Sequence, residues 1–167
     1  MTKKIRSLND VFLEELGDLY NAENQLIKAI PKMAEATNST ELKSALETHL
    51  EQTRNHVNRL EEIFRHLSVK PNGVTCKAMK GLIEESEEVI KKSEQCAARD
   101  AAIIGAAQRV EHYEIAGYGT AQSHASLLGY KRVEELLYET LEEEKGANSL
   151  LTDLAEGVIN SQAMQVA

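Results

Sequence analysis

Four stretches of this sequence, each roughly 30 residues long, repeat apolar residues with the period of an α-helix. In residues 8–36, for example, Phe12, Leu16, Leu19, Leu26 and Ile30 all lie on one stripe of a helix. Only two prolines occur in the 167 residues, so little interrupts such helices. Long helices joined by short turns must pack antiparallel, and the sequence therefore predicts an all-α fold, an antiparallel four-helix bundle.

A shorter amphipathic stretch separates the four long ones into two helical hairpins. The predicted helices cover residues 8–36, 40–69, 77–92, 97–128 and 130–160. The clearest loop signal is Lys70-Pro71-Asn72-Gly73, after the first hairpin. The short helix carries Met79, Leu82 and Ile83, which could form a dimer contact or pack over the end of the protein's own bundle. At this length we expect one domain covering residues 1–167.

Charge and composition exclude several classes of partner. A net charge of −8 argues against nucleic acid, which requires a basic surface, and no apolar run approaches the length of a membrane span. The first six residues are basic but lack the following apolar stretch of a signal peptide. Cys76 and Cys96 have neither metal-type spacing nor the number needed for a disulfide framework. We therefore expect a cytoplasmic protein with free thiols.

Acidic residues interrupt the apolar stripes of the second hairpin. Glu111 and Glu114 lie three residues apart on one face of the helix predicted for residues 97–128, and Glu144 lies on the inner face of the next helix. Burying a carboxylate among Ala, Val and Leu costs several kcal/mol unless a cation or a donor network offsets it. A metal site inside the bundle is the explanation that we favour.

The two hairpins also resemble each other as a degenerate repeat with an offset of 91 residues. The offset maps Glu23 onto Glu114 and Thr53 onto Glu144, so that Glu23, Glu111, Glu114 and Glu144 could converge in one central layer. His49 lies on the inner stripe of the helix predicted for residues 40–69. Carboxylates and imidazoles suit iron or manganese, and we expect Glu23, His49, Glu111, Glu114 and Glu144 to hold one or two such ions.

Several segments carry a resemblance to a known family. They are Val110-Glu111-His112-Tyr113-Glu114-Ile115-Ala116, Leu141-Glu142-Glu143-Glu144-Lys145, His49-Leu50-Glu51-Gln52-Thr53 and the stretch of residues 76–85. With them the chain resembles the YciF/YciE-type family of stress-associated bacterial proteins, specifically its YciF branch. The resemblance implies a ferritin-like four-helix bundle with a short extra helix, a homodimer, and kinship with rubrerythrins and other di-iron carboxylate proteins.

The chain departs from the di-iron pattern, which places Glu-x-x-His on two helices. Ala147 follows three residues after Glu144, and Arg54 three residues after Glu51. A one-metal site, an unusual two-metal site and a vestigial site therefore stay open. The roles of Gln52 and Glu143 are open as well, and His56 and His112 are expected to be structural or exposed.

Three functions are compatible with these patterns. The first is a di-iron or manganese oxidoreductase that acts on dioxygen or peroxide. The second is a stress-linked protein that binds the metal without turnover, and the missing Glu-x-x-His histidines favour it over the first. The third is a structural or partner-binding dimeric bundle with a vestigial, metal-free site. Whether the protein is an enzyme is not decided by the sequence.

Overall fold

The computed structural model describes residues 4–71 and 73–165, so that Asn72 of the predicted loop lies outside the described residues. The described helices are α1 (Leu8–Ala36), α2 (Thr40–His66), α3 (Lys77–Lys92), α4 (Ala97–Leu127), α5 (Lys131–Leu154), the π-helical turn η1 (Ala155–Ile159) and α6 (Asn160–Ala163). The predicted all-α fold is confirmed, and nine of the ten predicted starts and ends of helices agree within three residues.

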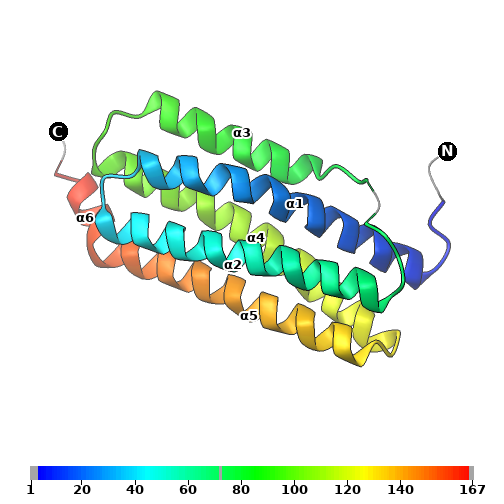
Figure 1. Cartoon of the computed structure of the whole chain (residues 1–167). Helices are drawn as coiled ribbons and strands as arrows, with labels where there is room; N and C mark the ends of the chain where they lie inside the picture. The colour runs from blue at the N-terminus through cyan, green and yellow to red at the C-terminus, as the bar shows by residue number, and fades with distance from the viewer. Residues whose placement is uncertain (1–3, 72, 166–167) are drawn as a thin grey trace.

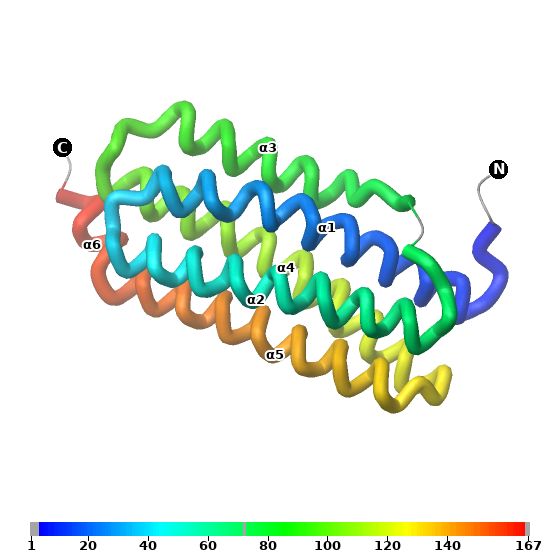
Figure 2. Tube along the Cα trace, in the orientation of Figure 1, coloured from blue at the N-terminus to red at the C-terminus, as the bar shows by residue number. Residues whose placement is uncertain are grey.

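Two antiparallel hairpins form the bundle. Helix α1 pairs with α2 and α4 with α5, and the hairpins join through contacts of α1 with α4 and of α2 with α5 (Figure 1). Each of these neighbouring pairs is antiparallel, because α3 carries the chain back along the bundle before α4 begins (Figure 2). This arrangement is the antiparallel four-helix bundle with a short extra helix that the sequence predicts.

Helix α3 packs along the side of its own bundle, against α1 and α4. Met79 is fully buried there, and Leu82 and Ile83 pack on the core. The helix therefore uses its apolar stripe within the chain, along the side of the bundle rather than over its end.

A buried acidic side chain from α4 stabilises the turn between α1 and α2. Asp100, in the first turn of α4, accepts hydrogen bonds from the backbone N–H groups of Asn38 (2.8 Å) and Ser39 (2.9 Å). Ser39 in turn caps α2 by accepting from the N–H of Leu42 at 3.2 Å. These contacts fix one end of the first hairpin against the second.

The last predicted helix does not continue unbroken to residue 160, because η1 interrupts it after Leu154. An unbroken α-helix would place Ile159 about 80° away from the buried Leu151 around the helix axis. The wider π-turn rotates Ile159 toward the core, where it is buried. Burial of this side chain is the physical reason for the interruption.

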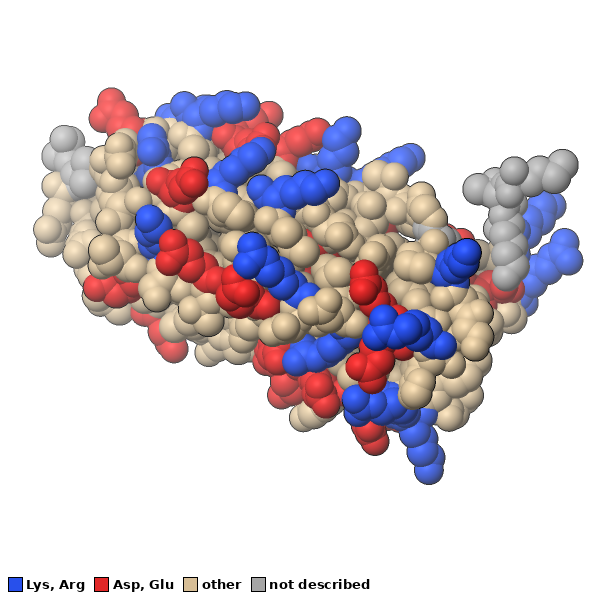
Figure 3. All heavy atoms as spheres, viewed as in Figure 1, with Lys and Arg blue, Asp and Glu red and all other residues tan. Residues whose placement is uncertain are grey.

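The apolar core is divided into two clusters, one at each end of the bundle. Ile30, Leu46 and Ile104 belong to one cluster, and Phe12, Leu60 and Leu137 belong to the other. A layer of buried acidic and histidine side chains lies in the helices between them. On the face shown in Figure 3, acidic and basic side chains are interspersed rather than gathered into a basic patch. Among the described residues, none of the helices is apolar and long enough to cross a membrane.

Candidate metal centre

Six ionisable side chains meet in the middle of the bundle, and each of the four long helices contributes to the group. All six are buried. They are Glu23 of α1, His49 and His56 of α2, Glu111 and Glu114 of α4, and Glu144 of α5. Their spacing along each helix follows the inner apolar stripe, so the packing of that stripe carries them inward. We call these six residues the central cluster.

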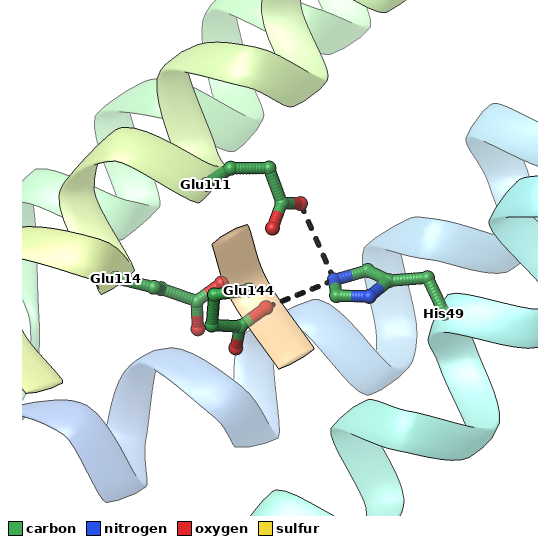
Figure 4. Close-up of side chains that lie close together, drawn as sticks. All are labelled: His49, Glu111, Glu114 and Glu144. Atoms are coloured by element: carbon green, nitrogen blue, oxygen red, sulfur yellow. Dashed lines mark ion pairs between the residues drawn. The ribbon is translucent and has the colours of Figure 1, made fainter. Parts of the chain in front are cut away.

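Four members of the central cluster form a first group around the imidazole of His49. Ligand atoms of His49, Glu111, Glu114 and Glu144 all lie within 4.8 Å of one another. His49 Nε2 is 3.2 Å from Glu111 Oε1 and 3.6 Å from Glu144 Oε2 (Figure 4). The figure shows the carboxylates of α4 and α5 directed toward the ring from α2. Three carboxylates and one imidazole nitrogen therefore surround one small volume.

The second group is built around His56. Its Nδ1 atom lies 3.2 Å from Glu23 Oε1 and 3.0 Å from Glu144 Oε1. Ligand atoms of Glu23, His56 and Glu144 also lie within 4.8 Å of one another. Glu144 belongs to both groups, with one oxygen toward each histidine. A carboxylate in this position can bridge two cations.

Both histidines use their other ring nitrogen to contact a neighbouring side chain. His49 Nδ1 lies 3.2 Å from Gln52 Oε1, and His56 Nε2 lies 2.7 Å from Glu143 Oε2. Arg59 holds Glu143 through two hydrogen bonds of 2.7 Å each. Metal-binding histidines typically have such a partner, which fixes the tautomer and the ring orientation. Gln52 and Glu143, whose roles the sequence leaves open, thus each contact one histidine of the central cluster.

Many polar atoms of the central cluster have no hydrogen-bond partner among the described residues. They are Glu23 Oε2, His49 Nε2, His56 Nδ1, Glu111 Oε2, and both carboxylate oxygens of Glu114 and of Glu144. The histidine nitrogens approach carboxylate oxygens at ion-pair distances but without the alignment of a hydrogen bond. Buried polar atoms are rarely left in this state, because each costs about 1–3 kcal/mol. The donor set fits a hard or borderline divalent cation.

Burial and mutual repulsion raise the pKa values of two acids of the central cluster, Glu114 and Glu144. Burial raises the pKa of Glu144 to about 7, although His56 opposes the shift. Burial also raises the pKa of Glu114, and the charges of Glu23 and Glu144 add to that effect. Without a cation, protons must therefore neutralise part of this cluster.

The pKa values of the two histidines are raised as well, which favours their charged form. Burial alone would lower the pKa of His49, but the carboxylates of Glu111 and Glu144 outweigh it and raise the pKa to about 9. The same competition, with Glu143 among the acids, raises the pKa of His56 to about 12. Protonated histidines can occupy the volume between the acids as the metal-free counterpart of bound cations.

A tyrosine completes the second group. Tyr118 is fully buried and its hydroxyl donates a hydrogen bond to Glu23 Oε1. The ring of Tyr118 also lies 6.2 Å from that of His56. Tyr20 instead donates its hydroxyl to Glu61. Of the tyrosines that the structure describes, Tyr118 is the one that donates a hydrogen bond to the central cluster.

All five residues expected to bind metal come together in the central cluster. His112 is exposed, as expected. His56 was expected to be structural or exposed, yet it is fully buried against Glu23 and Glu144. The sequence contained a signal for it, because the repeat maps Thr53 onto Glu144. Thr53-x-x-His56 therefore stands where a second Glu-x-x-His would, with threonine in place of the acid.

Comparison with known proteins identifies the family to which the chain belongs. Residues 7–164 match the family described as "Domain of unknown function (DUF892)". Protein YciF of Escherichia coli (strain K12) is 46% identical over 160 residues, which cover 95% of this chain and 96% of YciF. The crystal structure of that stress protein superposes with a TM-score of 0.90 over 93% of this chain and 99% of the other.

Two further solved structures share the fold. YcfI from Rhodopseudomonas palustris, a proposed structural protein, is 41% identical, with a TM-score of 0.86 over 91% of this chain and 97% of its own. A protein from Xanthomonas campestris pv. campestris is 18% identical, with a TM-score of 0.74 over 93% of this chain and 95% of its own, and shows the fold alone. The extent of these matches means that the chain belongs to the DUF892 family of YciF-like proteins.

Proposed function

We propose that this protein binds two divalent iron or manganese ions between its four long helices and uses them in chemistry with peroxide or dioxygen. The observation that carries the proposal is the set of unpartnered buried oxygens and ring nitrogens in the central cluster. Glu114 is the clearest case, because its carboxylate is fully buried and neither oxygen accepts a hydrogen bond within the described residues. A cation is the partner that such a carboxylate requires.

Charge balance favours two ions over one. When ionised, Glu23, Glu111, Glu114 and Glu144 carry four negative charges, and two neutral histidines add none. Two divalent cations balance that charge, whereas one leaves a net charge of −2 in an apolar core. The shared position of Glu144 between the two groups supports the same number.

Reduced iron or manganese at this position would supply electrons to peroxide or dioxygen, which is the chemistry that such ions add to a protein. The chain's own residues have separate tasks. Glu143, held by Arg59, fixes the ring of His56, and Gln52 does the same for His49. Tyr118 keeps its hydroxyl proton, because burial and the charge of Glu23 raise its pKa, and donates it in a hydrogen bond to Glu23 Oε1. The apolar clusters on either side limit the access of water.

Metal binding without turnover is the second candidate. Thr53 and Ala147 stand where two Glu-x-x-His motifs would supply an acid and a histidine, so the four carboxylates and two histidines of the central cluster come from other positions than in the di-iron pattern. A structural, metal-free bundle is the third candidate, with protonated His49 and His56 in place of the ions. The homodimer implied by the family resemblance is part of the proposal and can be measured by light scattering on the eluting protein.

The deciding experiment measures the metal content of protein purified without a metal-affinity tag. After anaerobic incubation with Fe(II) or Mn(II) and removal of free ions, we expect about two ions per chain. A Glu144→Gln variant should lose at least one of them, while the exposed neighbour change Glu142→Gln should lose none. Absence of stoichiometric metal in the unaltered protein would refute the proposal. Consumption of hydrogen peroxide by loaded protein and by the Glu144→Gln variant then separates turnover from binding alone.

A further inference from the structure

A pocket between α2 and α5 leads from the surface to the central cluster. Its volume is about 340 Å³, and His49 and Glu111 form part of its lining. Both residues have an unpartnered atom, His49 Nε2 and Glu111 Oε2, among the described residues. His49 is 7% exposed, the largest exposed fraction in the central cluster. This pocket therefore reaches the first group from the side of His49.

The hollow exists because small residues occupy the wall from α5. Gly146 and Ala147 line the pocket, and Ala45 lines it from α2. In the Glu-x-x-His pattern an imidazole would stand at position 147, three residues after Glu144. Here the imidazole of the first group comes from His49 on α2 instead. Alanine at position 147 is smaller than the histidine of that pattern, so the space beside it stays open.

The size and chemistry of the pocket indicate what it can hold. One water molecule takes up about 30 Å³ of liquid, so the volume of the pocket is about ten times that of one water molecule. The pocket is therefore larger than dioxygen or hydrogen peroxide requires. Leu46, Leu150 and Leu151 supply apolar walls. The lining also carries polar groups, and those of His49 and Gln52 lie beside the central cluster, where a ligand's head group would lie. Small-molecule sites have this combination of mostly apolar walls and a few convergent polar groups.

The charged side chains around the pocket restrict the net charge of the ligand that it can bind. Glu142 and Glu143 also line the pocket, with Lys145 and Arg59 as their ion-pair partners, and Glu111 lies at its inner end. These carboxylates disfavour an anionic ligand. A cationic ligand would lose its hydration against the leucine walls. A neutral molecule meets neither obstacle.

We propose that this pocket binds a small, neutral organic molecule with an apolar body and one oxygen-bearing head group directed at His49 and Glu111. The orientation of the head group rests on the proposed metal centre, because a bound ion is what the oxygen would approach. Binding of the apolar body rests only on the pocket itself. The two parts can therefore be tested separately.

Phenol is a suitable probe, since it combines an apolar ring with one neutral oxygen. Methyl NMR of leucine-labelled protein would follow a phenol titration of the metal-free protein. We expect saturable shifts at Leu46, Leu150 and Leu151, and none at Leu127, an exposed leucine at the end of α4. Loading with Zn²⁺, a diamagnetic stand-in for the redox-active ions, should tighten phenol binding at least tenfold.

Matched variants identify the pocket as the site. Ala147→Leu fills it from α5 and Ala45→Leu from α2, and each should weaken phenol binding at least tenfold. Ala98→Leu adds the same bulk at an exposed position about 20 Å from Glu111 along α4, outside the pocket lining, and should leave binding unchanged. Two filling variants on different helices keep the test valid if one of them folds poorly.

The outcomes separate the pocket from the metal centre. Phenol shifts that do not saturate, or that survive both filling variants, overturn the pocket proposal whatever the metal content. Equal phenol affinity of metal-free and zinc-loaded protein overturns the orientation of the head group. If the protein takes up no ion, the proposed metal centre fails, while the titration of the metal-free protein still decides whether the apolar body is bound.

Discussion

Replacing Glu144 by glutamine should stabilise the metal-free protein and weaken its response to metal. The side chain is fully buried, and glutamine has nearly the same shape without the charge. A pKa of about 7, against an ordinary value of 4.5, means that ionised Glu144 destabilises the fold by about 3 kcal/mol. The amide keeps part of the desolvation cost, so we expect a gain of about 2 kcal/mol at pH 8. For a chain of this length that gain raises Tm by about 4–8 °C.

The gain has a defined pH dependence. Because the pKa of Glu144 is raised in the folded state, its penalty is absent below pH 4.5, grows as the pH rises toward 7 and stays constant above that. The variant should therefore be more stable than the unaltered protein at pH 8 and equally stable at pH 4.5. Thermal unfolding of metal-free protein at the two pH values measures both differences.

Metal should remove the stability advantage of the Glu144→Gln variant. An ion at a hundred times its Kd adds about 2.7 kcal/mol, so two ions add about 5 kcal/mol to the unaltered protein. Glu144 belongs to both groups, so the loss of its carboxylate should raise the Kd of both ions at least tenfold. At the same ion concentration the added stability then falls to about 3 kcal/mol or less.

Two results would refute this reasoning. One is a metal-free Glu144→Gln variant that is less stable than the unaltered protein at pH 8, which would make the carboxylate a structural partner of His56. The other is an equal rise of Tm with metal in both proteins, which would remove Glu144 from any metal site. Glu142→Gln, on the exposed side of the same helix, controls for a change of net charge.

Three further predictions follow from individual contacts. The pKa of His49 is raised to about 9, so its protonated imidazole stabilises the metal-free fold fully below pH 6.5, and this effect is lost as the pH rises through 9. The urea concentration at the midpoint of unfolding should therefore fall between pH 6 and pH 9.5. A midpoint that does not change with pH would contradict the assignment. Glu143→Gln should weaken metal binding about 10–100-fold in a chelator competition, because His56 loses its charged partner, and an unchanged Kd would contradict this. Gly117→Ala should destabilise by about 1–3 kcal/mol, because its Cβ would lie 2.8 Å from Leu19 Cδ2, whereas Gly119→Ala meets nothing within 4 Å and should stabilise by about 0.5–1 kcal/mol; chemical denaturation of both variants measures the difference.

The helices and their pairing were predictable because they depend on local periodicity. The stripe of Phe12, Leu16 and Leu19 is buried as a unit, and short turns leave only antiparallel neighbours for long helices. The π-turn before Ile159 was not predictable in this way. It depends on where the core of the packed bundle lies relative to the Ile159 side chain, and that position is set by the packing of α5 against the other helices.

The convergence of Glu23, Glu114 and Glu144 was also predictable, because two related hairpins place equivalent positions at the same level of the bundle. Acids on an otherwise apolar stripe have to meet other polar groups when that stripe is buried. His49 follows from the same rule. These residues show how far one-dimensional periodicity determines a candidate site.

Only the tertiary structure decided which way each ring points and what surrounds it. His56 lies close to the edge of a stripe, and its burial depends on how α2 is rotated against α1 and α5. The division of Glu144 between two histidines, and the hollow left beside Ala147, depend on distances between helices that no single helix specifies. The sequence thus determined the bundle and most of its inward-facing acids, whereas packing between helices determined the pairing of those acids and the route to them.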